Sequence, residues 1–485
     1  MSNYAIFPRL ASTAPKSILL SALLTLPSAF AQDIYLAQGL LAGEPSESTV
    51  ILQTRLTSSP IPIEGDVPGM VGVGQFEIST SPDFKKSTFS EWINASNETD
   101  FILKTKIDSL KPTTTYHYRV IYGSEKGSAN PSSAASFKTL PTKDQSASIQ
   151  FVLTSCLNYA FFQNGDKTNS PAKPEDRALG YPALEPIAKL KPDFIILNGD
   201  CVYYDHPAHT AAKTRTELRK KWHEQYVMPR FVKLFSQTPT YWLKDDHDHR
   251  YNDSDLTGEK EPSNELGIAT FREQVPIVDP KSNTPTYRTH RMGKDLQLWF
   301  VEGRDYRSPN KMPDGPEKSL WGKEQREWLQ RTIKESNATF KILISPTPMI
   351  GPDDGYKSDN HANIKGFAQE GQAFFEWLKT NDIDPNKFFI LCGDRHWKYH
   401  TIHPHGFTEF SCGALNKENA RLGRIPGDPK SNDPDAKFRQ PYTDKPACGG
   451  FLHIDLKASS PQTPATLSIT LQDDSGKTLH QHQVK

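Results

Sequence analysis

Residue types that bind metal ions occur in four groups along this 485-residue chain, and each group directly follows a short apolar segment. In chain order, the groups are Ser155-Cys156, Gly199-Asp200 with Tyr203, Asp245-Asp246-His247-Asp248 and Gly393-Asp394-Arg395-His396. One such group alone would be interpreted as an ordinary hydrogen-bonded pair. Four of them indicate a shared site, because strands of open α/β sheets present their ligands at a common edge. Buried carboxylates without cations would repel one another and lose their charge, so the pattern predicts a site for several metal ions.

The donor atoms of these groups differ in chemical softness. The six predicted metal ligands are Cys156, Asp200, Tyr203, Asp246, Asp394 and His396. The thiolate, phenolate and imidazole among them suit a transition metal, and ferric iron in particular. The carboxylates of Asp246 and Asp394 offer only hard oxygens, which suit calcium, and Asp200 is the candidate bridge between two ions. The sequence therefore predicts Fe³⁺ together with one or two Ca²⁺ or other hard cations.

A layered α/β domain is needed to bring these groups together. The apolar segments that precede them are predicted strands at residues 149–153, 193–197, 240–243 and 388–391. Residues 214–235 have the pattern of one amphipathic helix. Residues 450–456 and 465–471 alternate as strands, which we expect to complete the second sheet. The predicted domain spans residues 148–485.

An all-β module is predicted upstream, over residues 32–141. This stretch consists of short alternating segments between turn residues and contains no cysteine. The turn Leu110-Lys111-Pro112 and the following Tyr116-His117-Tyr118 resemble the penultimate strand of a fibronectin type III-like domain, in which a tyrosine fixes a corner of the sandwich. A polar linker at residues 141–148 marks the boundary. The module either packs against the next domain or binds a glycan or a surface.

The order of the four metal-binding groups resembles that of the calcineurin-like metallophosphoesterases, and more specifically that of the PhoD-like alkaline phosphatase D family. That family has Ser-Cys after the first strand, Asp-Asp-His-acid in the third group and Gly-Asp-x-His in the last. Residues 301–307 and 321–329 also resemble the family, and Gly199-Asp200-x-x-Tyr203 resembles the purple acid phosphatases, whose tyrosine binds ferric iron. The resemblance implies a calcineurin-like αββα sandwich preceded by a fibronectin type III- or immunoglobulin-like sandwich.

The same resemblance implies a secreted, metal-dependent hydrolase of phosphoric esters. Hydroxide generated at the ions would attack the phosphorus of a phosphomonoester or phosphodiester. By the family pattern, His247 contacts phosphate or donates a proton to the leaving alkoxide; the alternative is a histidine that binds or supports a metal. Arg304 either clamps the phosphate or forms a buried structural ion pair. The candidates for the periphery of the site are Asp205, His206, His249 and Arg250.

Two other functions are compatible with these residues. A phosphodiesterase or phospholipase D-type enzyme would use the same ions, and no residue in the sequence separates monoesters from diesters. A non-catalytic surface protein, with a glycan-binding sandwich and a structural metal site, belongs to a different class. It predicts glycan binding without turnover of either ester.

All five cysteines lie in the predicted α/β domain, and their odd number leaves at least one thiol unpaired in an exported protein. Cys156 as a metal ligand agrees with this count, whereas the alternative is an ordinary disulfide framework. Cys201 stands where many family members have an aromatic residue, so it is either a further candidate ligand or a redox-sensitive thiol. Cys412 and Cys448 either form a disulfide or are simply buried.

Charge and the N-terminal segment limit partners and location. Basic and acidic residues number 57 each, and a formal net charge of +0 argues against a nucleic-acid-binding surface. The sequence predicts a secretory signal peptide over residues 1–31, cleaved after Ala31. It has the basic residues Arg9 and Lys16, an apolar run at residues 17–26 and the small-residue pattern Ala29-Phe30-Ala31 that are typical of such a peptide. The run is too short for the roughly 20 residues of a membrane span, so we predict no membrane anchor. The expected partner of the exported protein is a small-molecule or lipid phosphate ester.

Overall fold

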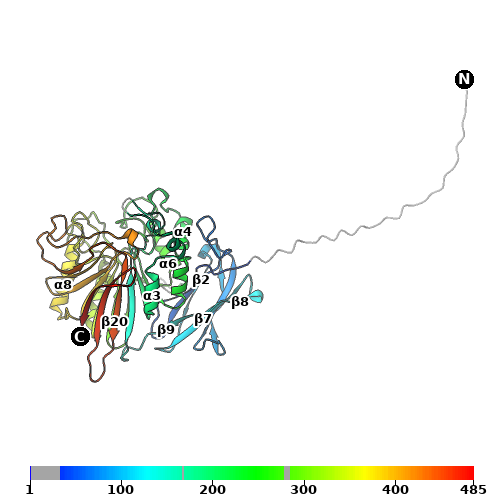
Figure 1. Cartoon of the computed structure of the whole chain (residues 1–485), viewed down its shortest axis with the longest axis horizontal. Coiled ribbons are helices and arrows are strands. Elements are labelled where there is room, and N and C mark those ends of the chain that lie inside the picture. Colours follow the sequence, from blue (N-terminus) through cyan, green and yellow to red (C-terminus); the bar gives the residue numbers. More distant parts are fainter. Residues whose placement is uncertain (2–32, 167–168, 278–283) are drawn as a thin grey trace. The chain divides into compact units, whose positions relative to one another are not determined.

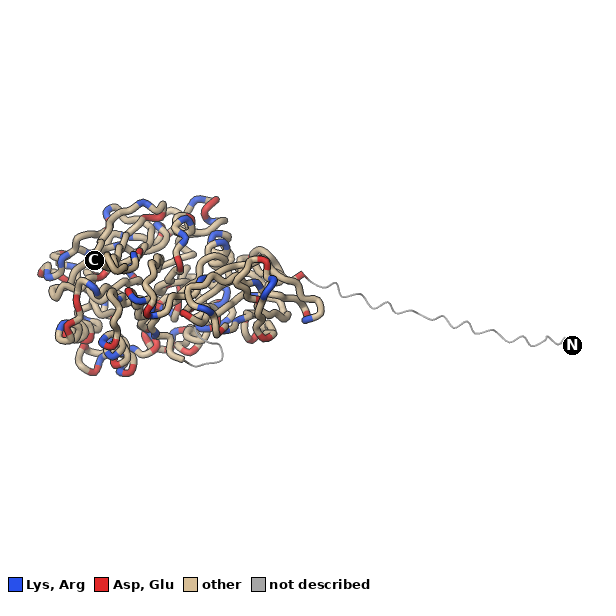
Figure 2. The backbone as a smooth tube through the Cα atoms, turned by 90° about the horizontal axis from the view of Figure 1, so that it is seen from below, with Lys and Arg blue, Asp and Glu red and all other residues tan. Residues whose placement is uncertain are grey.

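The computed structural model describes Met1 and residues 33–166, 169–277 and 284–485. Apart from Met1, the predicted signal peptide lies outside these residues. No helix in this part of the chain is long and apolar enough to cross a lipid bilayer. Figure 2 shows acidic and basic positions interspersed along the chain, in keeping with the net charge of zero.

A long first sheet runs from the C-terminal strands to the N-terminal ones, in the order β22-β21-β20-β10-β11-β12-β1-β2-β6. Its strands are β1 (Leu40–Gly43), β2 (Val50–Arg55), β6 (Ile102–Ile107), β10 (Ile149–Thr154), β11 (Phe194–Asn198), β12 (Thr240–Leu243), β20 (Gly450–Lys457), β21 (Thr466–Asp473) and β22 (Thr478–Val484). The central strands β10, β11 and β12 are parallel, so their carboxyl ends lie at one edge. They are almost entirely buried and apolar, as strands covered on both faces must be.

A second sheet packs against the first, in the order β13-β14-β15-β16-β18-β17-β19. Its strands are β13 (Arg288–Arg291), β14 (Leu296–Phe300), β15 (Phe340–Ser345), β16 (Phe388–Cys392), β17 (Lys398–Ile402), β18 (Thr408–Cys412) and β19 (Arg439–Thr443). The core between the sheets contains Phe151 and Phe194 of the first sheet, whose rings stack at 4.9 Å, with Ile342 and Leu391 of the second.

Helices cover the outer faces of both sheets. They are α1 (Tyr159–Asn164), α2 (Pro174–Leu179), α3 (Leu184–Leu190), α4 (Arg215–Tyr226), α5 (Pro229–Phe235) and α6 (Asn264–Gln274) on the first sheet, and α7 (Gly322–Glu335) and α8 (Ala368–Thr380) on the second. Trp222 of α4 lies in the core outside the first sheet, and Phe374 of α8 lies in the core outside the second. Figure 1 shows α3, α4 and α6 on one side of the paired sheets and α8 on the other. These four layers confirm the predicted αββα class.

The single helix predicted over residues 214–235 is in fact two helices. α4 begins with a capping box, in which Thr214 Oγ1 accepts from Glu217 N and the Glu217 carboxylate accepts from Thr214 N. Pro229 opens α5 and has no N–H with which to continue the preceding helix, so the chain turns at Met228.

The expectation that the C-terminal strands complete the second sheet is wrong. β20 pairs antiparallel with β10, and β21 and β22 extend the first sheet from there. The alternating pattern indicates strands, but the edge that a strand joins depends on tertiary contacts that alternation does not encode.

The N-terminal part is β-rich, as predicted, and forms a sandwich. One layer consists of β1, β2 and β6. The other is a third sheet in the order β4-β3-β7-β8, in which β5 also pairs with β3 and β9 also pairs with β7. The third sheet contains β3 (Gly72–Ser79), β4 (Ser87–Phe89), β5 (Ile93–Ala95), β7 (Thr115–Gly123), β8 (Asn130–Pro131) and β9 (Ala135–Lys138). Tyr116 forms the tyrosine corner, since its hydroxyl accepts a hydrogen bond from Lys111 N at 2.9 Å.

The sandwich shares a sheet with the α/β part, which the sequence did not predict. β1 pairs in parallel with β12, and Glu44 N donates to Thr240 O at 3.0 Å. The predicted linker at residues 141–148 is also packed, because Gln145 O accepts from Lys294 N at 2.8 Å.

A group of buried and half-buried charges, here called the sandwich clamp, joins the sandwich to α4 and α6. Its members are Arg55, Asp66, Asp100, Arg219, His223 and Glu273. Asp100 accepts from Arg55 at 3.0 Å, and its other carboxylate oxygen lies 2.6 Å from Nε2 of His223. Nδ1 of His223 lies 2.8 Å from Asp66, so both ring nitrogens face carboxylates.

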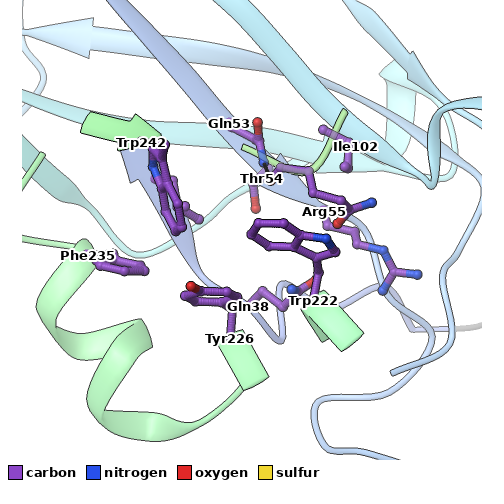
Figure 3. A pocket seen from close by; sticks show the side chains of 11 residues that line it. Gln38, Gln53, Thr54, Arg55, Ile102, Trp222, Tyr226, Phe235 and Trp242 are labelled. Carbon is purple, nitrogen blue, oxygen red and sulfur yellow. Dashed lines mark hydrogen bonds between the residues drawn. The ribbon is translucent and has the colours of Figure 1, made fainter. Parts of the chain in front are cut away.

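The cavity beside the clamp is too small for a ligand. Figure 3 shows the rings of Trp222, Tyr226 and Trp242 facing Gln53 and Thr54 of β2. The space between them measures about 30 Å³, room for one or two water molecules. This junction is therefore a packed interface, and the chemistry must lie elsewhere.

Candidate metal centre

The carboxyl ends of parallel strands from both sheets meet at one edge, where the predicted metal-binding groups lie. Asn198, the last residue of β11, donates from Nδ2 to the carbonyl of Ser345, the last residue of β15, at 2.8 Å. Gly393, after β16, approaches the first sheet so closely that a Cβ would lie 2.4 Å from Asn198 O. Only glycine fits there, so the glycine of the Gly-Asp-x-His motif lets the two sheet edges converge.

Four predicted ligands form one group at this edge. Cys156 Sγ, a carboxylate oxygen of Asp200 and a ring nitrogen of His396 all lie within 4.8 Å of one another. Tyr203 joins them, since its hydroxyl donates to Asp200 Oδ2 at 3.0 Å and accepts from Asn419 at 3.1 Å. The sulfur, phenol and imidazole donors together fit a transition metal.

A second group consists of carboxylates alone. Oxygens within 4.8 Å of one another come from Asp200, Asp245, Asp246 and Asp394. Asp200 belongs to both groups, as a bridging ligand would, and Asp246 also belongs to a third group with Asp253 and Asp359. Several of these oxygens are buried without a hydrogen-bond partner among the described residues, namely Asp200 Oδ1, Asp245 Oδ2, Asp246 Oδ1 and both oxygens of Asp359. Such orphaned anionic oxygens fit hard cations.

Burial and mutual repulsion make ionisation of this cluster costly. Burial raises the pKa of Asp200 well above its usual value; His247 counteracts this effect, while Asp246 and Asp245 add to it. Burial also raises the pKa of the Cys156 thiol, and the charge of Asp200 raises it further. Metal ligands bind in their ionised forms, so cations would offset the cost.

Three predicted ligands have a left-handed backbone. The φ angles are 56° at Cys156, 53° at Asp200 and 60° at Asp394. Each angle occurs two residues after the end of a strand, where the chain turns at the shared edge. Such angles cost free energy for residues that carry a Cβ, and strained backbone of this kind concentrates at functional sites.

His247 lies beside both groups. A ring nitrogen of His247 is within 4.8 Å of carboxylate oxygens of Asp200 and Asp246, and the ring stacks on Tyr203 with centroids 4.1 Å apart. Nδ1 lies 2.7 Å from Asp205 Oδ1. Burial opposes protonation of His247, but Asp205 and Asp246 outweigh it and raise its pKa. Asp205 and His206, expected only at the periphery, form a further group of potential ligands with His247.

Comparison with known proteins assigns this geometry to a family. The family model described as "PhoD-like phosphatase" matches residues 151–453, more than half of the chain. The chain belongs to the PhoD-like phosphatase family. The model of a second domain, described as "PhoD-like phosphatase, N-terminal domain", matches residues 24–141. Both matches confirm the resemblance on which the sequence analysis relied.

One curated relative of this PhoD-like chain is alkaline phosphatase D of Bacillus subtilis (strain 168). It is 23% identical over 397 residues, which are 74% of this chain and 64% of the relative. The chain therefore spans slightly less than two thirds of the length of that protein.

Two solved structures share the PhoD-like fold. A structure of PhoD is 18% identical, with a TM-score of 0.69 and 94% of each chain covered. The purple acid phosphatase PPD1 from yellow lupin (Lupinus luteus) seeds is 12% identical, with a TM-score of 0.59, 94% of this chain covered and 74% of that one. These matches confirm the fold class, a calcineurin-like α/β domain with an N-terminal β domain.

Arg304 is fully buried in this PhoD-like chain. Nε donates to Asp245 Oδ1 at 2.7 Å, and Nη1 donates to Ser254 O at 2.8 Å. Nη2 lies 3.6 Å from both Asp246 and Asp359. Of the two roles that the sequence left open, this is the geometry of the buried ion pair, which holds Asp245 in place. A direct contact with phosphate stays a prediction.

The five cysteines all lie in the described part of the PhoD-like chain, and all are free thiols. Cys412 is buried and Cys448 half-buried, so burial, not a disulfide, is the outcome of those two alternatives. Sγ of Cys201 lies 3.5 Å from Leu243 O, within the core beneath the helices. Tyr203, not Cys201, therefore faces Asp200.

His249 and Arg250 belong to the loop after β12. The guanidinium of Arg250 donates to the carbonyl oxygens of Pro262 and Asp255 at 2.7 Å and 3.0 Å. His249 is fully buried and packs against Gly267, where a Cβ would lie 1.9 Å from His249 O. Within the described residues, neither joins a group of potential ligands.

Sequence reasoning missed Asp253, in the loop after β12, and three further residues at the centre. Lys357 and Asp359 come from the loop between β15 and α8, and Asn419 comes from the segment after β18. None directly follows a predicted strand and none has a motif-like spacing. They reach the centre only because long loops fold back over the edge of the sheets.

Proposed function

We propose that this protein is a metal-dependent hydrolase of phosphoric esters. The observation that carries the proposal is the convergence of buried carboxylate oxygens, unpartnered among the described residues, on a thiol, a phenol and an imidazole. Folded proteins do not keep such charges out of water without a counter-charge. Membership of the PhoD-like phosphatase family supports phosphate chemistry at these ions.

The donor types support two kinds of ion. The proposed ligands of Fe³⁺ are Cys156, Asp200, Tyr203 and His396. The proposed ligands of one or two Ca²⁺ are Asp246 and Asp394, with Asp200 shared. Bound cations would neutralise phosphoryl oxygens and lower the pKa of a water molecule from about 15.7 to about 7.

The side chains around the ions would orient groups and move protons. Asp205 engages Nδ1 of His247, which leaves Nε2 for the substrate. Because neighbouring carboxylates raise the pKa of His247, its protonated form would be available to give a proton to the leaving alkoxide. Arg304 would favour ionisation of Asp245 and hold it in place.

We also propose that the protein is exported and binds its substrate outside the cytoplasm. The secretory pattern of residues 1–31 supports export. The name of the Bacillus subtilis relative, alkaline phosphatase D, supports a phosphatase activity. A small-molecule or lipid phosphate ester would be the partner.

Elemental analysis of the purified protein, combined with hydrolysis of 4-nitrophenyl phosphate and bis(4-nitrophenyl) phosphate, tests the proposal. We expect bound iron and calcium, loss of hydrolysis on chelation and recovery when the metals are restored. Full metal content without turnover of either ester would instead support a structural metal site. Turnover that survives complete metal removal would refute metal dependence.

A further inference from the structure

Arg304, which the sequence offers as a clamp for the phosphate, has no access to solvent in the fold. Arg304 has no exposed side-chain surface, and it already donates to Asp245 and Ser254. Arg395 is likewise buried, between Asp353 and Asp394. A phosphate-binding charge that keeps access to solvent must therefore come from another residue.

Lys357 is a cation at the same centre that keeps access to solvent. Its side chain is 11% exposed, and the next residue toward the N-terminus, Tyr356, is 72% exposed. The Lys357 ammonium forms an ion pair with Asp253, whose backbone N–H donates to Asp246 Oδ2 at 2.5 Å. Only one residue, Asp253, thus separates the ammonium from a predicted metal ligand.

The charge of Lys357 acts on the metal centre as a whole. It lowers the pKa of Asp359, and it favours ionisation of Asp246 and Asp394. A lysine ammonium has three N–H donors, and the pair with Asp253 uses one of them. The remaining donors and the flexible stem let Lys357 hold a phosphoryl oxygen without leaving Asp253.

Another exposed cation near the centre is already occupied. Arg421 stacks on Trp397, with the guanidinium carbon 4.4 Å from the ring centroid, and lies 3.3 Å from Asp354. Its planar group is therefore directed at the loop, whereas the Lys357 ammonium is directed at the carboxylates of the centre.

We propose that Lys357 binds the third non-bridging oxygen of a phosphomonoester and so makes this enzyme selective for monoesters over diesters. This inference rests on the proposed hydrolase function. A monoester presents three charged or partly charged non-bridging oxygens, whereas a diester presents two and carries an uncharged ester group in place of the third. With a monoester, the ammonium gains a charge-assisted hydrogen bond to the third oxygen. With a diester, the ammonium loses solvation and gains no such bond.

The test compares kcat/KM for 4-nitrophenyl phosphate and bis(4-nitrophenyl) phosphate in wild type, K357M, K357Q and K357R. We expect K357M and K357Q to lower the monoester value by about tenfold or more and the diester value by less than about threefold, as loss of one charge-assisted bond requires. K357R should recover most of the monoester activity. The matched control is K365M, because Lys365 is exposed on the same loop; it should change neither value.

Elemental analysis and thermal unfolding accompany each variant. An equal fall for both esters, or no fall for either, would overturn the proposal. Loss of bound metal in both K357M and K357Q would also overturn it, since Lys357 would then support the centre and not the substrate.

Measurements of phosphate binding test the role of Lys357 independently of the proposed hydrolase function. Metal-loaded K357M should bind inorganic phosphate about tenfold more weakly than wild type, with binding of dimethyl phosphate unchanged. If metal-loaded wild type hydrolyses neither ester, the hydrolase function fails, and calorimetry with these two anions alone decides the role of Lys357. Equal phosphate affinity in wild type and K357M would refute that role.

Discussion

The sandwich clamp and the metal centre are both clusters of charged side chains, and they differ in whether every carboxylate oxygen in the interior has a partner among the described residues. In the sandwich clamp, each carboxylate meets a donor: Asp100 accepts from Arg55 and Gln274 and faces His223, and Glu273 accepts from Arg219 at 2.6 Å. In the metal centre, oxygens of Asp200, Asp245, Asp246 and Asp359 have no hydrogen-bond partner in the part of the chain that the structure describes.

The difference separates a structural cluster from a functional one. Both clusters contain fully buried acids and bases, such as Asp100 and Asp245, so burial alone does not distinguish them. A matched cluster needs nothing from outside, whereas an unmatched one is stable only with an added cation or added protons. The same physical test can be applied to any cluster of buried charge.

Asp200→Asn tests the unmatched cluster and has the largest expected effect. Asparagine keeps the size of the side chain and tolerates the left-handed backbone, but it is a poor bridge between two cations. Loss of a residue that only supports a metal ligand costs about 10–100-fold, so loss of the bridge should lower kcat by more than about a hundredfold. Hydrolysis of 4-nitrophenyl phosphate and elemental analysis measure the effect.

Asp200→Asn should not lower the stability of the metal-free protein, although it should lower kcat. The pKa of Asp200 is raised in the fold, so metal-free protein loses stability as the pH rises from the unfolded-state pKa of about 3.9 toward the folded-state value. Metal-free Asp200→Asn should therefore be at least as stable as metal-free wild type at alkaline pH. A marked loss of stability in this variant would show that Asp200 is structural.

Asp100→Asn tests the matched cluster. It leaves Arg55 and His223 buried with a neutral partner, so the free energy of unfolding should fall by about 3 kcal/mol, as for other broken buried pairs. Urea denaturation measures the change, and the folded variant should keep its metal content and kcat. The control is Asp108→Asn, an exposed residue 3.0 Å from Lys106, for which roughly 0–1 kcal/mol is expected.

Acid should weaken the clamp. Burial opposes ionisation of Asp100, but His223 and Arg55 outweigh it and hold the pKa of Asp100 below its usual value. The resulting stability is complete above the unfolded-state pKa of about 3.9 and is lost as the pH falls toward the folded-state value. Below about pH 4, the free energy of unfolding of wild type should therefore fall more steeply than that of Asp100→Asn. Parallel curves in denaturant titrations would contradict this expectation.

Two tyrosines of β7 give the smallest expected effects. The hydroxyl of Tyr116 accepts from Lys111 N, so Tyr116→Phe should cost about 1 kcal/mol in urea denaturation. The hydroxyl of Tyr118 is buried and has no hydrogen-bond partner among the described residues, so Tyr118→Phe should be neutral or slightly stabilising. Equal losses in both variants would contradict the expectation that the hydrogen bond from Lys111 N sets the two hydroxyls apart.

Much of the metal centre was predictable because its residues follow strands. A parallel strand delivers the next few residues to a known edge, so Cys156, Asp200 and Asp246 could be assigned to one site before their distances were known. Asp359 and Lys357 were not predictable, because they lie in a loop whose path depends on contacts such as Asp359 N with Asn363. The two roles left open for Arg304 also could not be separated, since depth of burial is not a property of its neighbours in the chain.

The fold shows the same division. Alternation and turn residues correctly predicted a β-rich N-terminal part and a layered α/β part, but they assigned β20 and β21 to the wrong sheet. They also gave no sign that β1 pairs with β12, which makes the sandwich and the α/β part share one sheet.

The sequence by itself determined the fold class, the family and the chemical types of the metal donors, because these depend on residue identity and on local periodicity. Only the tertiary structure decided which carboxylates remain unmatched, that Tyr203 and not Cys201 faces Asp200, and that Lys357 stands at the centre. The physical reason is that hydrogen bonding, desolvation and charge compensation depend on distances between residues far apart in the chain, and only folding sets those distances.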